Sequence, residues 1–222
     1  MNHITEKIKE IEAKLPAGVK LVAVSKLKPV ETLMQAYEGG FRRFGENYVQ
    51  ELSGKFENMP KDIEWHMIGH LQSNKVKYIA PFVSMIHSVD SFKLLVEINK
   101  QAAKNDRVID CLLQVHIAEE DTKTGMSEEE LLEIINADQL KSLKNVRILG
   151  LMGMSTFTDD LYQVRREFKS LKKIFDDVKS MGKTSDNFSM NEISMGMSGD
   201  WPLAIEEGST MVRVGSAIFG SR

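Results

Sequence analysis

The chain has 222 residues, of which 42% are apolar, so it can bury one sizeable hydrophobic core, and we expect a single domain over residues 1–222. Its 29 lysines and arginines and 32 acidic residues give a net charge of −3, which provides no electrostatic reason to expect nucleic acid or an anionic membrane as a partner. The single cysteine, Cys111, excludes an internal disulfide. The sequence contains no signal peptide and no apolar run of about 18 residues, so we expect a protein of the cytoplasm.

Short apolar segments alternate with amphipathic ones along the whole chain. After an opening helix over about residues 4–15, the apolar and β-branched segments predict eight strands. Their ranges are 19–25, 43–46, 64–68, 83–88, 109–117, 147–154, 191–195 and 211–214. Between them, Pro29 opens a helix, Ser127 begins a capping box, and Leu161 starts a run of apolar residues at helical spacing. This alternation predicts an α/β fold, a (β/α)8 TIM-type barrel with an extra N-terminal helix, with a doubly wound open sheet as the alternative.

Lys26 stands directly after the first predicted strand. The carboxyl ends of strands carry the active site in barrels and in open α/β sheets, so this position places an amine where chemistry occurs. An amine that is partly shielded from water there can condense with an aldehyde to form a Schiff base. From this segment alone, Lys26 can equally mark the point where a buried strand meets solvent.

Polar residues also follow the second, third and fourth predicted strands. Asn47 and His70 follow strands two and three, at the same end of the barrel as Lys26. His70 suits a place near a cofactor as well as a structural role. Ser73 and Asp90 suit helix caps, which we favour for both. The five histidines fall in separate segments and no set of side chains has metal-ligand spacing, so we expect no zinc site.

Two loops rich in glycine and serine follow the seventh and eighth predicted strands. The first contains Ser194 and Ser198, and the second contains Gly215 and Ser216. In (β/α)8 enzymes these loops and a short extra helix often form a phosphate site, because backbone N–H groups and the helix dipole converge there. Taken separately, the glycines would serve turns and the serines would serve caps. A phosphate site that faces the Lys26 amine across a barrel mouth describes pyridoxal 5′-phosphate (PLP) as the cofactor.

Several longer segments carry a family resemblance: AVSK with a following proline, FGENYVQE, WHMIGHLQSNKVK, GLMGMS, SMGMSGDWPLAI and GSTMVRVGSAIFG. In these the chain resembles, nearly end to end, the YggS/PROSC family, also called the pyridoxal phosphate homeostasis proteins. That family resembles the amino-terminal barrel of bacterial alanine racemase, a fold-type III PLP barrel, without its C-terminal β domain. The resemblance implies that Lys26 is the aldimine lysine and that Arg213 faces the pyridine nitrogen.

The resemblance also implies further cofactor-binding positions. Near the ring these are Asn47 and Met154, with His70 in the neighbourhood, and near the phosphate they are Ser194, Ser198, Gly215 and Ser216. The end of the sixth strand, around Met154, and His116 depart from the residues usual in the family.

Arg213 bears on whether such a protein is an enzyme. Arginine does not lose its proton, so it would leave the pyridine nitrogen unprotonated and make the ring a poor electron sink. A racemase also needs acid or base groups on both faces of its substrate, and we expect no second domain after Arg222 to supply the opposite one. We therefore expect a monomeric protein without catalytic residues that holds PLP as a lysine aldimine for PLP homeostasis and carriage, with PLP-dependent apoenzymes as candidate partners. A low-activity amino-acid racemase and a lysine-dependent aldolase are the alternatives.

Overall fold

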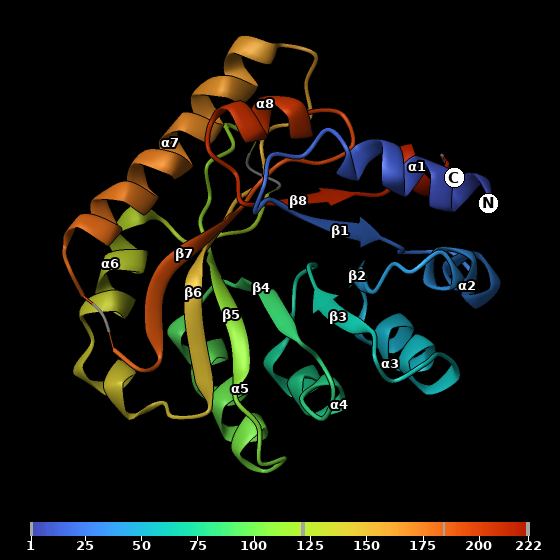
Figure 1. The fold of residues 1–222 in the computed structure, drawn as a ribbon. Coiled ribbons are helices and arrows are strands. Elements are labelled where there is room, and N and C mark those ends of the chain that lie inside the picture. The colour runs from blue at the N-terminus through green and yellow to red at the C-terminus, as the bar shows by residue number, and fades with distance from the viewer. Residues whose placement is uncertain (1, 121–122, 184, 221–222) are drawn as a thin grey trace.

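The strands form a closed barrel that is surrounded by helices (Figure 1). The computed structural model describes residues 2–120, 123–183 and 185–220. Eight strands pair in sequence order, all in parallel, and β8 closes the barrel against β1 with Val22 beside Arg213. The predicted (β/α)8 barrel is confirmed.

Helices and strands follow one another in an almost regular alternation. In chain order they are α1 (His3–Glu12), β1 (Lys20–Val24), α2 (Val30–Glu38), β2 (Arg43–Glu46), α3 (Val49–Asn58), β3 (Glu64–Met67), the 3-10 helix η1 (Ser73–Lys75), α4 (Val76–Ile79), β4 (Met85–Val89), α5 (Phe92–Ala103), β5 (Ile109–Gln114), α6 (Glu128–Asn136), the 3-10 helix η2 (Asp138–Ser142), β6 (Val146–Met152), α7 (Leu161–Ser180), β7 (Phe188–Ser194), α8 (Trp201–Glu206), β8 (Met211–Val214) and α9 (Ser216–Phe219).

The extra N-terminal helix, α1, joins the helical layer outside the barrel, where it packs against α2 and α9. Asn2 caps it by accepting the Thr5 N–H at 2.8 Å, and the Asn2 amide in turn donates to the Gln35 carbonyl at 2.9 Å. The first and the last described helices, α1 and α9, thus lie side by side (Figure 1). The opening helix is therefore fixed to its neighbours by polar contacts as well as by its apolar face.

Two strands differ from the prediction by three residues at one end, and four others differ by one or two residues. β7 begins at Phe188, three residues before the expected start at Asn191, because the polar residues of this segment alternate with the buried side chains of Phe188 and Met190. β5 ends at Gln114, before the expected end at Ile117, where the chain leaves the ladder and Val115 forms an isolated bridge to Met126.

Neither Ser73 nor Asp90 caps a helix, so both predictions are wrong. η1 begins at Ser73 and the residue before it, Gln72, makes no capping hydrogen bond with its side chain. α5 is capped by Ser91, whose Oγ accepts the Leu94 N–H at 3.3 Å. The Asp90 carboxylate is instead directed to a histidine of the neighbouring loop.

Most apolar side chains pack between the strands and the helices, and the buried Cys111 belongs to this core. Burial raises the pKa of the Cys111 thiol, so it is not a nucleophile at neutral pH. In the part of the chain that the structure describes, no helix is long and apolar enough to cross a membrane. The same part contains no group of three or more His, Cys, Asp or Glu side chains placed to hold a metal ion.

Candidate functional site

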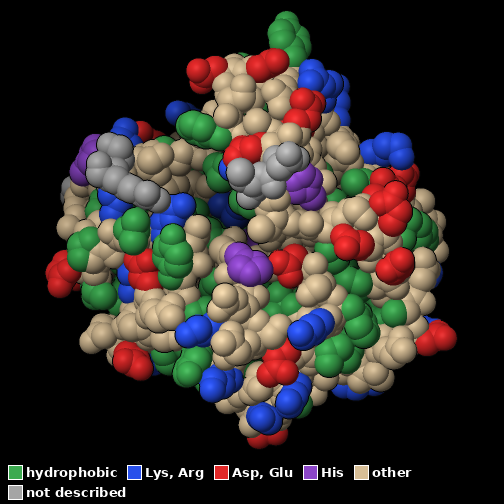
Figure 2. All heavy atoms as spheres, turned by 180° about the vertical axis from the view of Figure 1, so that it is seen from behind, with side chains coloured by type: hydrophobic (Ala, Val, Ile, Leu, Met, Phe, Trp, Pro, Cys, Tyr) green, Lys and Arg blue, Asp and Glu red, His purple; other side chains and the backbone are tan. Residues whose placement is uncertain are grey.

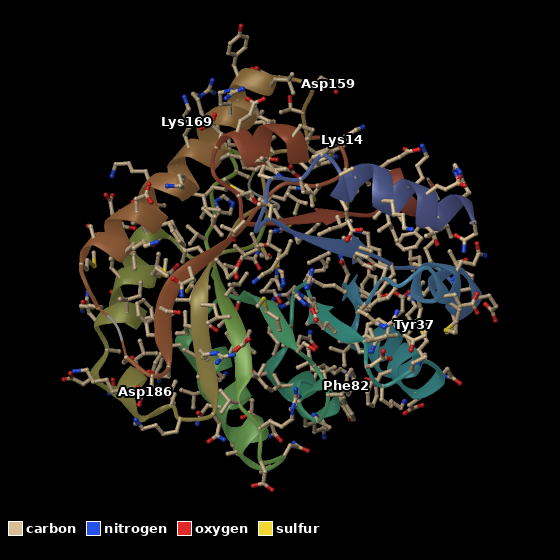
Figure 3. All side chains as sticks on the ribbon, in the orientation of Figure 1. Lys14, Tyr37, Phe82, Asp159, Lys169 and Asp186 are labelled. Carbon is tan, nitrogen blue, oxygen red and sulfur yellow. The ribbon has the colours of Figure 1, made fainter. Side chains whose placement is uncertain are left out.

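Side chains fill the inside of the barrel (Figure 3). Successive residues of a strand point to opposite faces, so every second residue enters the interior. An apolar layer is formed by five buried residues from five strands, Val22, Met85, Leu112, Met152 and Met211. Two residues further along β4 and β8, toward the carboxyl ends of the strands, lie His87 and Arg213. A polar layer therefore lies on the side of the barrel where the loops after the strands converge.

A chain of hydrogen bonds crosses this polar layer. Arg213 Nη1 donates to Ser194 Oγ at 2.6 Å, and Ser194 Oγ lies 3.1 Å from Nδ1 of His87. His87 Nε2 lies 2.8 Å from Nδ1 of His66. The Ser194 hydroxyl accepts from Arg213 and has both a proton and a second lone pair left for His87, and the direction of the two contacts of His87 depends on its tautomer. The chain holds the Arg213 side chain in one orientation.

The two histidines in this chain are neutral at neutral pH. Burial lowers the pKa of His66 to about 3, with smaller contributions from the positive charges of Arg43 and Lys20. Burial also lowers the pKa of His87 well below its usual value, and His66 and Arg213 act in the same direction. A neutral imidazole has one donor and one acceptor nitrogen, so His87 can bond to both Ser194 and His66 without a charge.

Arg213 is a buried cation without a carboxylate partner. Its residue is 3% exposed, and none of the ion pairs among the described residues involves it. Burial lowers the pKa of Arg213 to about 10, although the negative charge of Asp200 opposes this, so the guanidinium stays protonated at neutral pH. Its hydrogen bonds to Ser194 Oγ and, at 3.0 Å, to the Gly153 carbonyl use two of the five N–H groups. The remaining donors favour an acceptor on a bound molecule.

The loops after β7 and β8 are joined through Ser198. Its Oγ accepts the backbone N–H of Gly215 at 3.0 Å and that of Ala217 at 3.5 Å. A Cβ at Gly215 would lie 3.0 Å from the Val24 carbonyl oxygen, tighter than nearly all real contacts, so glycine permits this loop to approach the end of β1. Ser216 is exposed at the first position of α9. The two predicted loops thus lie together, beside the strand that leads to Lys26.

Lys26 lies two residues after the end of β1 and is half-buried. Within the described ranges, its amine takes part in no hydrogen bond or ion pair. The backbone around it is tightly held, because Ser25 is fully buried and Leu27 has a φ of 60°, a left-handed conformation that residues other than glycine seldom adopt. The amine is therefore available to a ligand although its backbone is fixed.

Asn47 and His70 lie on another part of the barrel mouth, after β2 and β3. They line a hollow of about 420 Å³ together with Tyr48, Val49, Gln50, Gly69, Gln72 and Lys75. His70 is exposed, and its Nδ1 lies 3.2 Å from an Asp90 carboxylate oxygen, which explains why Asp90 does not cap α5. Seen from behind, histidine and basic side chains gather around a hollow near the middle of the molecule (Figure 2).

The predicted site residues fall into three groups. Lys26, Ser198, Gly215 and Ser216 are brought together by β1 and β8, Ser194 and Arg213 lie inside the barrel, and Asn47 and His70 line the hollow. Met154 packs against the apolar layer of the interior. Ser194 therefore lies with Arg213 rather than with Ser198.

Sequence reasoning missed the contact between His66 and His87. The signal was present, because both residues occupy predicted strands three and four, and neighbouring parallel strands place their inward residues in layers. His66 pairs with Met85, whose side chain is interior, so His66 is interior too and His87 follows two residues later. Alternation, applied strand by strand, would have found this pair.

The chain matches the alanine racemase N-terminal domain family over residues 1–222. It is 41% identical over 204 residues to the pyridoxal phosphate homeostasis protein of Aquifex aeolicus, which covers 91% of this chain and 87% of that protein. The chain belongs to the pyridoxal phosphate homeostasis protein family. A relative of the same name from Schizosaccharomyces pombe is 39% identical over 209 residues, 92% of this chain and 85% of that protein. The resemblance expected from the motifs is confirmed.

Solved structures agree with this family. PipY of Synechococcus elongatus is 34% identical, with coverage of 98% of this chain and 100% of that chain, and its structures without and with PLP bound match with TM-scores of 0.89 and 0.87. Alanine racemase from E. faecalis matches with a TM-score of 0.72 over 99% of this chain and 58% of that chain. Its 17% identity shows a common barrel fold and no more.

Proposed function

We propose that this protein binds PLP reversibly through Lys26 and serves in PLP homeostasis as a store and carrier. The relatives are named pyridoxal phosphate homeostasis proteins, and the 34% identical PipY has been solved with PLP bound. Within this chain, the observation that carries the proposal is Arg213, a buried cation with N–H groups to spare and, among the described residues, no ion-pair partner. Such a donor suits the acceptor nitrogen of an unprotonated pyridine ring.

The loops after β7 and β8 fit the phosphate of this cofactor. Glycine at position 215 lets the loop after β8 approach the end of β1, and Ser198 Oγ gathers the N–H groups of Gly215 and Ala217 beside the hydroxyl of Ser216. Ser194 has a different part, because its hydroxyl is already engaged by Arg213 and His87. We assign Ser194 to the cofactor site as the group that orients Arg213.

Asn47, His70 and Met154 complete the proposed surroundings of the ring. Met154 packs against the apolar layer of the barrel interior, so it offers an apolar surface below the mouth. Asn47 and His70 line the hollow after β2 and β3 and would close the opposite side. Replacing either of these two residues should weaken PLP binding less than replacing Lys26 or Arg213, because neither provides a covalent link or a buried charge.

When bound, PLP supplies an aldehyde that condenses with amines and a ring that can accept electrons. Lys26 contributes the amine; condensation forms one C=N bond and releases one water, and hydrolysis returns both groups. Arg213 retains its proton, since its pKa of about 10 is far above neutral, and would donate to the ring nitrogen without protonating it. The neutral His87 keeps Ser194, and through it Arg213, in place. This arrangement favours storage over chemistry at the Cα atom of amino acids.

The direct test uses Lys26→Ala. After loading with PLP and reduction with borohydride, the wild-type protein should gain the mass of one cofactor on Lys26, whereas the folded variant should gain none. Stoichiometric trapping in the variant would contradict the assignment. Pyridoxal without phosphate should bind more weakly, by about 1.5–3 kcal/mol for each lost charge-assisted hydrogen bond. Equal affinity for PLP and pyridoxal would contradict the proposed phosphate site.

A racemase activity is the other outcome to measure. The loaded wild-type protein should exchange the Cα proton of alanine for deuterium only slowly, because an unprotonated ring stabilises a carbanion weakly. Exchange and racemisation at roughly 1 per second or faster would show an enzyme and overturn the storage proposal.

We further propose that the protein is a monomeric single domain over residues 1–222 that acts in the cytoplasm and hands PLP to apoenzymes. Size-exclusion chromatography with light scattering tests the monomer. Transfer is tested by reactivating a PLP-dependent apoenzyme either in the same solution or across a dialysis membrane. Direct transfer predicts faster reactivation in the same solution, whereas equal rates would mean that PLP travels free.

A further inference from the structure

The backbone on both sides of Lys26 is held by two charged side chains from the next βα unit. Lys55 of α3 donates to the Ser25 carbonyl at 2.8 Å, just before Lys26. Glu51 of the same helix accepts the Leu27 N–H at 2.6 Å, just after it. The peptide that carries the site amine is thus fixed at both neighbouring residues by side chains of one helix.

The two side chains are themselves locked together. The Lys55 ammonium donates its two other hydrogen bonds to Glu46 Oε1 at 2.7 Å and to Glu51 Oε1 at 2.6 Å. All three of its donors are therefore used, which leaves one geometry for the group. The Ser25 hydroxyl also donates to Glu46 Oε1, at 2.5 Å. The side chains of Glu46 and Lys55 are 0% and 6% exposed, so water does not compete with these bonds.

Glu46, Glu51 and Lys55 together form a clamp, and the conformation of Leu27 shows that this clamp acts on the backbone. Its φ of 60° lies in the left-handed region, which is strained for a leucine. The Leu27 side chain is 56% exposed, so apolar burial does not compensate for the strain. Two hydrogen bonds hold this conformation: the Leu27 N–H donates to Glu51, and the Lys28 N–H donates to the Ser25 carbonyl at 3.1 Å.

We propose that Glu51 and Lys55 are positioning residues. By fixing the backbone on both sides of Lys26 they fix the direction in which its side chain points, and so set the rate at which its amine condenses with an aldehyde. The inference depends on the proposed function of Lys26. Neither Glu51 nor Lys55 contacts the amine itself; they act through Leu27 and Ser25.

The chain offers a matched control on α7. Lys173 and Asp177 form an ion pair with the same i, i+4 spacing as Glu51 and Lys55, at 2.6 Å, but their side chains are 73% and 49% exposed. Breaking this pair with Lys173→Met changes charge and helix stability by a comparable amount without touching the loop after β1.

The experiment compares Glu51→Ala, Glu51→Gln and Lys173→Met with the wild-type protein. Two rates are measured: trapping of PLP on Lys26 by borohydride, and trace acetylation of Lys26 by acetic anhydride without PLP, normalised to Lys61 by peptide mass spectrometry. We expect Glu51→Ala to slow PLP condensation roughly 10- to 100-fold, because small misplacements of a reacting group have effects of this size. Glu51→Gln keeps an acceptor for the Leu27 N–H and should restore most of the rate, while Lys173→Met should leave it unchanged.

Two results would overturn the inference: wild-type rates in Glu51→Ala, or equal losses in Glu51→Ala and Glu51→Gln. If Glu51→Ala does not fold, Glu51→Asp replaces it, since its shorter side chain keeps the charge but does not reach the Leu27 N–H, and a wild-type rate in Glu51→Asp has the same meaning. If the wild-type protein traps no PLP, the proposed function fails, and the acetylation rates still decide whether the clamp governs the reactivity of Lys26.

Discussion

Two buried cations lie near the barrel mouth, one at the loop after β1 and one on the neighbouring strand β8, and their surroundings are opposite. Lys55 contacts the carboxylates of Glu46 and Glu51, whereas Arg213 donates to a hydroxyl and a carbonyl and, among the described residues, forms no ion pair. A buried charge is costly unless it is paired, so Lys55 is satisfied within the protein and Arg213 is not. The partners of a buried cation, more than its burial, therefore distinguish a positioning group from a binding group.

The side chains around the two cations, which we call the charged wall and the neutral wall, also differ in their interactions. The charged wall, beside Lys26, is held by opposite charges, with Glu46 and Lys55 almost completely removed from water. The neutral wall, beside Arg213, consists of Ser194, His87 and His66 in a chain of hydrogen bonds. Neutral supports leave the positive charge of Arg213 uncompensated, and so available to a bound acceptor.

The largest expected effect is that of removing the paired cation. Lys55→Met should destabilise the protein by about 3–5 kcal/mol, because it leaves the Glu46 carboxylate buried beside Glu51 without a counter-charge. The midpoint of urea unfolding at pH 7.5 measures this loss. Removing the acceptor as well, in Lys55→Met with Glu46→Gln, should recover part of it. A loss no larger than that of an exposed lysine such as Lys173 would refute the distinction between the two cations.

Removing the unpaired cation should affect binding more than folding. Arg213→Leu fills a similar volume and takes away a charge that no carboxylate balances, so the free energy of unfolding should change by no more than about 1 kcal/mol without PLP. The affinity for PLP should fall by about 1.5–3 kcal/mol, the value of a hydrogen bond from a charged donor. Urea unfolding and fluorescence titration measure the two quantities. Severe unfolding combined with normal PLP affinity would mean that Arg213 is structural.

The fold was predictable because each strand is apolar and each helix has a recognisable start. The two largest differences between predicted and observed strand ends are in β5 and β7. There, polar residues within or beside the strand obscure the point where it begins or ends. The capping error at Asp90 has another cause: its carboxylate pairs with His70 across two loops, and local propensity does not include such a partner.

The site was predictable only in part. Lys26 and the loops after β7 and β8 could be located because strand ends and glycine-rich turns are local signals. The contacts around Lys55 could not, since a lysine on an amphipathic helix is normally exposed, and its burial depends on how α3 packs against β1 and β2. Ser194 was predicted near the phosphate because a segment rich in glycine and serine follows it. As the last residue of β7, it faces the barrel interior, where its hydroxyl accepts from Arg213.

The smallest expected effect concerns pH, and its sign differs between the two walls. Burial raises the pKa of Glu46 from 4.5 to about 7, although Lys55 opposes the shift, so the folded state binds this proton more tightly than the unfolded chain. The resulting stabilisation is complete below pH 4.5 and is lost as the pH rises through 7. The pKa of His87 is lowered below 6.5, so its contribution is present above pH 6.5 and is lost on acidification. In the wild-type protein the two contributions oppose each other between pH 7 and 5.

Single variants should separate these contributions. On going from pH 7 to 5, Glu46→Gln should lose stability relative to the wild-type protein, because it lacks the group that gains a proton on folding. His87→Gln should gain relative stability over the same interval, because it lacks the imidazole that must stay neutral in the core. Each change should be on the order of 1 kcal/mol. The midpoints of urea unfolding at the two pH values, measured without PLP, test this. If stability relative to the wild-type protein changes with the same sign in both variants, the charged wall and the neutral wall do not differ in the way their contacts indicate.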